Sequence, residues 1–249
     1  CSAMSMKILG TSFDLHLGGE DLAFPHHEDE IAQSEGATGK PFVKHWLHGA
    51  HLLVEGKKMS KSLGNFFTLR DLIEKGYDGR EVRQLMISAH YRETFNFTLA
   101  GLDGARTAMA RIDECVAKLR DAKADAGDAD AASEVIEKFT AALDDDLNVS
   151  SAWGVVFDWV RDCNRRLAEN QMDAATAAAE LAAWERIDTV LGVGKAEEAA
   201  PVELTALLEE RAEARKAKDF ARADAIRDEL AKEGWTIEDT PKGARLKRG

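Results

Sequence analysis

The stretch that decides the fold is Lys58-Met59-Ser60-Lys61-Ser62-Leu63-Gly64-Asn65. It follows a short apolar run, Leu52-Leu53-Val54, which predicts a buried strand that leaves into a loop at Glu55-Gly56. The two lysines, Lys58 and Lys61, therefore bracket small hydroxyl residues in a loop. Mobile ammonium groups on such a loop suit the charge of a departing pyrophosphate. A basic loop can also be only a solvated surface, so this loop alone leaves both interpretations open.

A second chemical string, Phe24-Pro25-His26-His27-Glu28-Asp29-Glu30, lies upstream. Proline in the first turn and the acidic residues after it predict a helix that opens at Phe24-Pro25. On a helix, His26 and Glu30 face the same way, so together they can hold a divalent metal. A thiolate would favour zinc, and Cys1 is the nearest thiol in the sequence. The alternative is a helix start stabilised by acids beside two surface histidines.

Around these strings, residues 1–98 have the pattern of mixed α/β structure. Apolar and polar residues alternate from Thr11 to Leu17, which predicts a strand. Thr68 and Asp71 have the spacing of a capping box, and Gly76 is expected to end the helix that they open.

From residue 101 to 192 the pattern becomes helical, with apolar residues at three- and four-residue spacing. One of these helices carries an apolar stripe of Trp153, Phe157 and Val160. Such a stripe is typical of a bundle core rather than of a cofactor site. Ser150 or Ser151 is expected to cap this helix.

The chain is punctuated by an acidic break at Asp125–Ala132 and by a linker at Gly192–Pro201. Residues 202–249 have the pattern of two charged helices and a small hairpin around Thr240-Pro241-Lys242-Gly243. From Arg211 to Gly249 the net charge is +3, whereas the whole chain carries −12. An acidic body with a basic tail suits local contact with nucleic acid, although a solvated tail can be basic too.

The composition is that of an ordinary globular protein, with 45% hydrophobic and 31% charged residues in a chain of 249. No apolar run approaches the roughly 18–20 residues of a membrane span. No signal peptide is visible at Cys1-Ser2-Ala3-Met4. Cys1, Cys115 and Cys163 are far apart, which is no disulfide framework and fits a reducing cytoplasm.

Taken together, these strings resemble the cysteinyl-tRNA synthetase family in order and spacing. The lysine string is similar to the second signature of class I aminoacyl-tRNA synthetases. The other matching strings are Cys1-Ser2-Ala3-Met4, Phe13-Asp14-Leu15-His16, Gly18-Gly19-Glu20-Asp21-Leu22, Phe24–Glu30, Ser88-Ala89-His90-Tyr91-Arg92, Asp144-Asp145-Asp146-Leu147-Asn148 and Lys218–Asp228. The resemblance implies an α/β plus all-α chain. It has the second half of a Rossmann-type catalytic domain (1–98), a helical bundle domain (101–192) and a small α+β anticodon-recognition tail (202–249).

The resemblance also implies a zinc site. Cys1, His26 and Glu30 match three of the family's four ligands, and the fourth belongs to an N-terminal part that these residues do not include. His27 is the alternative to His26. The sulfur of substrate cysteine would bind the zinc, which discriminates strongly against serine.

For the nucleotide, the residues that match are His16, Gly18, Gly19, Asp21 and Lys61. Lys61 matches the lysine that contacts ATP, which is bound with Mg²⁺, and Lys58 assists it. Glycines would let the backbone approach the nucleotide closely. Leu17 stands where the family often has another glycine, and His16 could instead be a structural histidine.

In the tail, Phe220 matches an aromatic residue that stacks on an anticodon base, flanked by Asp224 and Arg227. The alternative is that Phe220 packs the two tail helices together. Ala244 and Leu246 replace family residues that are usually polar or aromatic.

The implied activity is cysteine–tRNA ligation: cysteine is activated with ATP and transferred to tRNA(Cys) by a cytoplasmic monomer. The first class I signature, His-x-Gly-His, does not occur in this sequence. We therefore expect the chain to be about half of the enzyme and inactive without its N-terminal half. Two other functions remain open: a mycothiol-type ligase joining cysteine to an amino sugar, and a non-catalytic tRNA-binding fragment.

Overall fold

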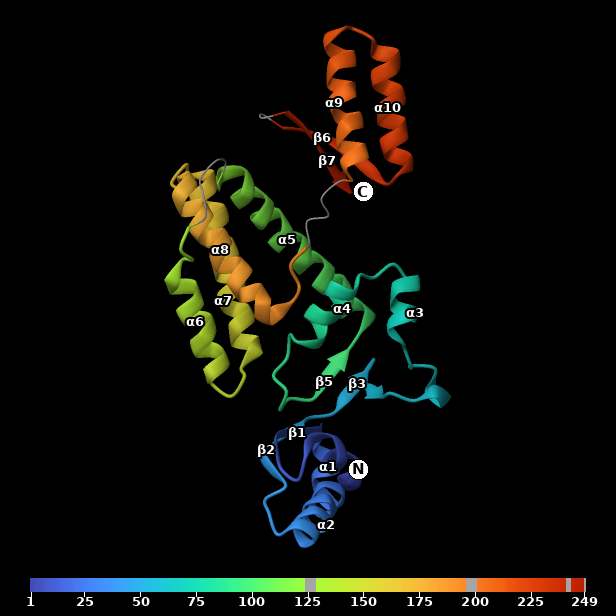
Figure 1. Cartoon of the computed structure of the whole chain (residues 1–249), viewed down its shortest axis with the longest axis vertical. Coiled ribbons are helices and arrows are strands. Elements are labelled where there is room, and N and C mark those ends of the chain that lie inside the picture. Colours follow the sequence, from blue (N-terminus) through green and yellow to red (C-terminus); the bar gives the residue numbers. More distant parts are fainter. Residues whose placement is uncertain (124–128, 196–200, 241–242, 249) are drawn as a thin grey trace. The chain divides into compact units, whose positions relative to one another are not determined.

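The computed structural model describes residues 1–123, 129–195, 201–240 and 243–248 (Figure 1). Parts of the predicted acidic break, linker and hairpin turn therefore lie outside the described residues. The chain divides into two compact units: unit 1 is Cys1–Gly194 and unit 2 is Lys195–Gly249. Unit 1 begins with mixed α/β structure and continues into long helices, and unit 2 is a small α+β body. The predicted fold class is confirmed.

Unit 1 opens with helix α1 (Ser2–Leu9), strand β1 (Phe13–Gly19), helix α2 (Glu28–Thr38) and strand β2 (Val43–Gly49). The two strands pair in parallel, so α2 is the crossover of a βαβ unit. The strand predicted at residues 11–17 is confirmed as β1, which begins two residues later. The predicted helix begins at Glu28 rather than at Phe24-Pro25, because the backbone of Phe24 is extended (φ −134°, ψ 132°) and a five-residue π turn intervenes.

The lysine string lies in the next part, which contains β3 (Leu52–Val54), β4 (Lys57–Lys58), α3 (Leu69–Glu74), α4 (Gly79–Met86) and β5 (Phe95–Phe97). The strand order is β4-β3-β5. The predicted strand is confirmed, although only Val54 in it is buried. The capping box is also confirmed: Thr68 accepts from the amide of Asp71, and the Asp71 carboxylate accepts from the amide of Thr68. A small core of Val54, Leu72, Leu85, Phe97, Leu102 and Ala105 joins these elements.

Four helices form the bundle: α5 (Leu99–Lys123), α6 (Ser133–Asp144), α7 (Val149–Ala168) and α8 (Ala174–Leu191). Trp153 and Val160 lie in their shared core, as the apolar stripe predicted, and the half-buried Phe157 packs against it. The predicted serine cap is wrong. Asn148 caps α7 by accepting from the amide of Ser151, because the helix begins at Val149, two or three residues earlier than a cap at Ser150 or Ser151 would start it.

Unit 2 contains helices α9 (Val202–Lys216) and α10 (Phe220–Lys232) and the antiparallel strands β6 (Trp235–Thr240) and β7 (Gly243–Arg248). Its buried side chains are Ala223, Ile226, Leu230 and Trp235. Among the described residues, no helix combines the length and the apolar character that a bilayer span requires.

Candidate active and metal-binding site

A cavity of about 620 Å³ opens in unit 1 where α1, β1 and α2 meet. The side chains around it that can bind a metal are Cys1, His16, His26, His27, Asp29 and Glu30. Helices α1 and α2 are joined beside this cavity by the buried Ser2 of α1, whose hydroxyl donates to Gln33 of α2 over 3.0 Å. This contact holds the thiol that precedes α1 beside the same cavity as the carboxylates of α2.

All three predicted metal ligands, Cys1, His26 and Glu30, thus line one cavity. Within the part of the chain that the structure describes, a different set of donor atoms comes together: His16, His27 and Glu30 each offer an atom within 4.8 Å of the others. His16 Nε2 lies 3.3 Å from Glu30 Oε2, close enough to attract it but without hydrogen-bond alignment. That oxygen is buried and has no hydrogen-bond donor among the described residues.

A buried carboxylate oxygen without a partner is costly, and a cation would satisfy it. Thiolate, imidazole and carboxylate are the donors that zinc takes in proteins. The donor groups around this cavity therefore fit a zinc ion in their chemistry.

The two neighbouring histidines differ in their surroundings. His26 is exposed, whereas His27 is only 5% exposed and its Nδ1 lies 2.8 Å from Nε2 of His48 on β2. Burial, and then the nearby His16 and His48, hold the pKa of His27 below its ordinary value. One nitrogen of the His27 ring is thus already engaged by His48. Nothing local in the sequence pointed to His48, because only the pairing of β1 with β2 brings it to this place.

Two predicted glycines of the active-site floor lie at the end of β1, and the structure gives a reason for each. A Cβ on Gly18 would lie 2.5 Å from Cε1 of His27, and a Cβ on Gly19 would lie 2.5 Å from Oδ1 of Asp21. The glycines therefore make room for neighbouring side chains, which is a reason separate from the predicted approach to a nucleotide. Asp21 itself is exposed.

On the same strand, the centre of the His16 ring lies 4.7 Å from that of Trp46, its cross-strand partner on β2, with the two rings tilted by 35°. His16 therefore has both a packing partner and a face toward the cavity.

The lysine loop is closed by Asn65. Its Nδ2 donates to the carbonyls of Val54 (3.1 Å) and Lys58 (3.2 Å), and its Oδ1 accepts from the amide of Ser60 (2.9 Å). Lys58 is exposed on β4, and Lys61 begins a short 3₁₀ turn. One amide thus fixes the loop at both ends and leaves Lys58 open to solvent.

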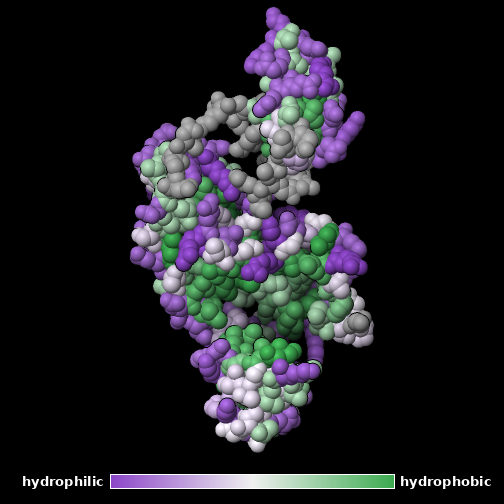
Figure 2. All heavy atoms as spheres, in the orientation of Figure 1, coloured by the Kyte–Doolittle hydropathy of each residue, from purple (hydrophilic) through white to green (hydrophobic). Residues whose placement is uncertain are grey.

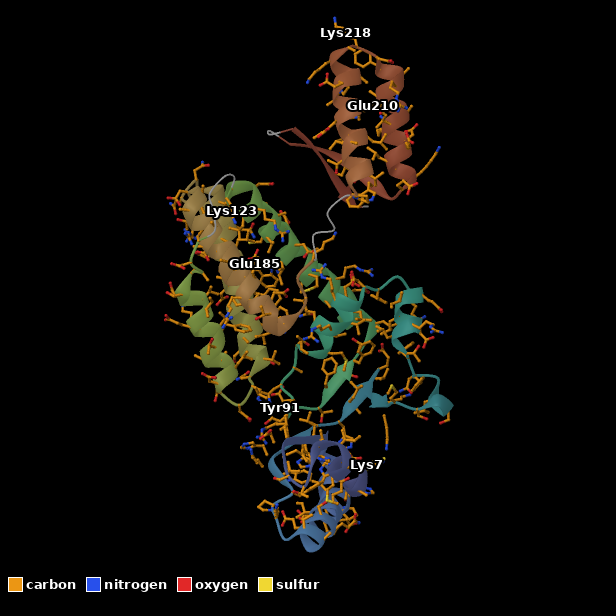
Figure 3. The ribbon with its side chains drawn as sticks, in the orientation of Figure 1. Lys7, Tyr91, Lys123, Glu185, Glu210 and Lys218 are labelled. Atoms are coloured by element: carbon orange, nitrogen blue, oxygen red, sulfur yellow. The ribbon has the colours of Figure 1, made fainter. Side chains whose placement is uncertain are left out.

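A second contact that the sequence did not predict joins the segment after α4 to the turn between α6 and α7 (Figure 3). The Tyr91 hydroxyl donates to Asp146 over 2.6 Å, and Arg92 Nε lies 2.6 Å from the same carboxylate. Arg92, and then Tyr91, lower the pKa of Asp146 to about 2. Tyr91, Arg92 and Asp146 all lie in strings that only the family resemblance singled out.

In unit 2, Phe220 is the first residue of α10 and is 62% exposed. The buried side chains of α10 are instead Ala223, Ile226 and Leu230, which argues against the alternative role of Phe220 as the residue that packs the helices together. Asp224 and Arg227 form an exposed ion pair at 3.2 Å one turn further on.

Comparison with known families assigns each part of the chain. Residues 1–107 match the family described as tRNA synthetases class I (C) catalytic domain. Residues 138–195 match the DALR domain, and residues 197–245 match the cysteinyl-tRNA ligase anticodon binding domain.

Individual proteins agree with these matches. A cysteine–tRNA ligase of Protochlamydia amoebophila is 42% identical over 254 residues, which cover 100% of this chain and 53% of the relative. One of Symbiobacterium thermophilum is 45% identical over 261 residues, covering 100% and 55%. The chain spans about half the length of these curated relatives. A solved ternary complex of Agrobacterium radiobacter K84 agnB2 LeuRS with tRNA and LeuAMS is similar in fold alone, with a TM-score of 0.58 at 16% identity over 71% of this chain and 25% of that one.

Proposed function

Because the chain belongs to the cysteinyl-tRNA synthetase family, we propose that it serves the ATP-dependent activation of cysteine and its transfer to tRNA(Cys). The observation that carries the proposal is the cavity of unit 1, which gathers thiol, imidazole and carboxylate groups in a chain that also has the lysine loop. Since the chain spans about half of its relatives, we propose that an N-terminal half completes the enzyme.

Cys1, His26 and Glu30 are the residues that we assign to zinc, with His27 as the alternative to His26. The buried oxygen of Glu30, which accepts no hydrogen bond among the described residues, supports the assignment. When bound, zinc would favour the thiolate of cysteine over the hydroxyl of serine. The contact with His48 holds the His27 ring in place beside the cavity.

The lysine loop and the end of β1 are assigned to ATP and its Mg²⁺. In the first step the cysteine carboxylate attacks the α-phosphate, pyrophosphate leaves and cysteinyl-adenylate forms. Lys61, assisted by the exposed Lys58, would meet the charge on the phosphates, which is where most of such catalysis arises. His16, Gly18, Gly19 and Asp21 would hold the adenylate. In the second step a hydroxyl of the terminal adenosine of the tRNA attacks the adenylate to give the ester.

Unit 2 is assigned to the anticodon. The exposed ring of Phe220 at the start of α10 can stack on an unpaired base, and Asp224 and Arg227 lie on the same helix. We propose domains at 1–98, 101–192 and 202–249, and a monomer in the cytoplasm. The anticodon domain match argues against a ligase that acts on an amino sugar.

The test is cysteine-dependent ATP–pyrophosphate exchange with zinc supplied. We expect no exchange by the 249-residue chain alone. Exchange should appear when the chain is fused behind the N-terminal half of the Symbiobacterium relative, a protein that we call the completed enzyme. Lys61→Met should abolish exchange, whereas Lys57→Met, on the neighbouring lysine outside the string, should not.

Two outcomes would contradict the proposal. A completed enzyme that binds tRNA but makes no adenylate would favour a non-catalytic tRNA-binding role. An adenylate that is consumed by an amino sugar but not by tRNA would favour the other ligase.

A further inference from the structure

The last residues of unit 1 are held firmly, although the sequence gives them the composition of a linker. Helix α8 ends with Gly192 in the left-handed conformation (φ 61°). The carboxylate of Asp188 then accepts from the amides of Val193 (2.8 Å) and Gly194 (2.7 Å). Val193 is fully buried. The point at which the chain leaves unit 1 is therefore fixed in space.

Two arginines of α4 hold this same segment. Arg80 Nε donates to the carbonyl of Val193 over 2.6 Å, and Arg83 Nε donates to the carbonyl of Leu191. The Arg80 fork also pairs with Asp113 of α5 at 2.7 and 3.2 Å, which fixes its direction. The last carbonyls of a helix lack partners within it, and cations are favoured at its negative end. We call Arg80, Arg83 and these two carbonyls the α4 clasp.

Helix α4 also packs against the elements that flank the lysine loop. Its Leu85 shares one core with Val54, the last residue of β3, and with Leu72 of α3. β3 precedes the loop and α3 follows it, so both flanks of the loop pack in the core that holds α4. The clasp therefore ties the exit point of unit 1 to the frame that carries the lysine loop.

We propose that Arg80 and Arg83 are positioning residues for the tRNA-dependent step of the reaction. This inference rests on the proposed function. A tRNA read by unit 2 must deliver its terminal adenosine to unit 1, and a fixed exit point on unit 1 for the connection between the units raises the effective concentration of that group at the site. Activation of cysteine involves no tRNA and does not depend on this connection. The clasp thus separates the two steps: loosening it slows transfer and leaves adenylate formation intact.

The first variant is Arg83→Met in the completed enzyme, which keeps the length of the side chain and removes its donors. We expect kcat/KM for tRNA(Cys) to fall about tenfold, as for the loss of one charge-assisted hydrogen bond. ATP–pyrophosphate exchange should be unchanged. Arg83→Lys, which can still donate to one carbonyl, should recover part of the loss. Arg111→Met, an exposed arginine of α5, is the matched control and should change neither reaction.

The second variant is a flexible insertion of about six Gly/Ser residues between Gly194 and Lys195. It frees unit 2 from the fixed exit point without touching the clasp, so it should reproduce the tRNA defect of Arg83→Met. Because both changes act on the same exit point, the combined variant should be no worse than the insertion alone. Additive losses would overturn the proposal, since they would mean that Arg83 acts elsewhere.

Hydrogen exchange at the amides of Val193 and Gly194 shows whether Arg83→Met has opened the clasp. Faster exchange there together with an unchanged kcat/KM for tRNA would overturn the proposal. A wild-type completed enzyme without adenylate formation would overturn the proposed function first, before any variant is compared.

Discussion

The helical bundle and the N-terminal segment of unit 1 are stabilised in different ways. Helices α5 to α8 bury a large apolar core in which the rings of Trp159 and Trp184 stack at 5.9 Å. In residues 1–49, all of which the structure describes, Phe42 is the only large hydrophobic side chain that is buried. Met4, Ile8, Leu9, Leu15, Leu17 and Phe24 are exposed there by 51–81%. Figure 2 shows hydrophobic residues at the surface of this part of the chain.

The comparison shows where the burial of apolar residues accounts for stability and where it does not. The bundle buries its hydrophobic residues in its own core. The N-terminal segment depends instead on polar contacts around the cavity, such as that of His27 with His48. Substitutions of apolar residues should therefore destabilise the bundle most, and substitutions around the cavity should destabilise the N-terminal segment most.

The largest effect should come from the bundle core. Leu119→Ala removes a fully buried side chain of α5 and should lower the free energy of unfolding by about 2–5 kcal/mol. The matched variant Leu15→Ala, on the exposed face of β1, should change it by less than about 0.5 kcal/mol. Urea unfolding of both variants measures the contrast. Equal losses would mean that the N-terminal segment has a core of its own.

Zinc should act on the opposite region. Zinc at about one hundred times its dissociation constant should stabilise the binding-competent segment by about 2.7 kcal/mol. Hydrogen exchange should slow in α2 and stay unchanged in the bundle core. Metal analysis of the purified chain gives a direct count, and Glu30→Gln should lower both the count and the protection. A chelator that loosens the bundle as much as α2 would contradict the comparison.

Two glycines offer a smaller test within the N-terminal segment. Gly18→Ala places a Cβ against the His27 ring and should cost about 1–3 kcal/mol as an overpacked contact. Gly36→Ala, in α2 with open space around the new Cβ, should stabilise by about 0.5–1 kcal/mol. Thermal unfolding of the pair measures both signs. A neutral Gly18→Ala would show that the His27 ring can move aside.

The smallest effect concerns acid. The folded pKa of Asp146 is about 2, below its ordinary value of 3.8, because Arg92 and Tyr91 stabilise the carboxylate. Its contribution to stability is therefore present above the ordinary pKa and is lost as the pH falls toward 2. Asp146→Asn should be less stable than the wild type at pH 6, and the gap should narrow between pH 4 and pH 2. A gap independent of pH would exclude this ion pair as its cause.

Local signals explain what could be predicted. The strand at Leu52–Val54, the capping box at Thr68 and the helical region after residue 101 each depend on residues close together in the sequence. The serine cap of α7 was wrong by a few residues because Asn, Ser and Thr are all good caps, and only the backbone decides between them.

Contacts between distant residues could not be predicted in this way. Nothing local in the sequence pairs His27 with His48, because that contact depends on two strands lying in parallel register. Arg80 and Val193 are 113 positions apart, and Gly192–Gly194 have the composition of a linker. For the metal site, the spacing of His26 and Glu30 suggested a shared helix face, but the proximity of His16 appeared only in the folded sheet.

The closure of the lysine loop by Asn65 should determine how the loop moves as well as its structure. This amide contacts the strand before the loop, the first lysine and Ser60, so the loop cannot fray from one end. We therefore expect the whole loop to move between its conformations together, in a single step. Relaxation dispersion would then report one common rate for the amides between Val54 and Asn65, and Asn65→Ala would divide it into independent, faster motions.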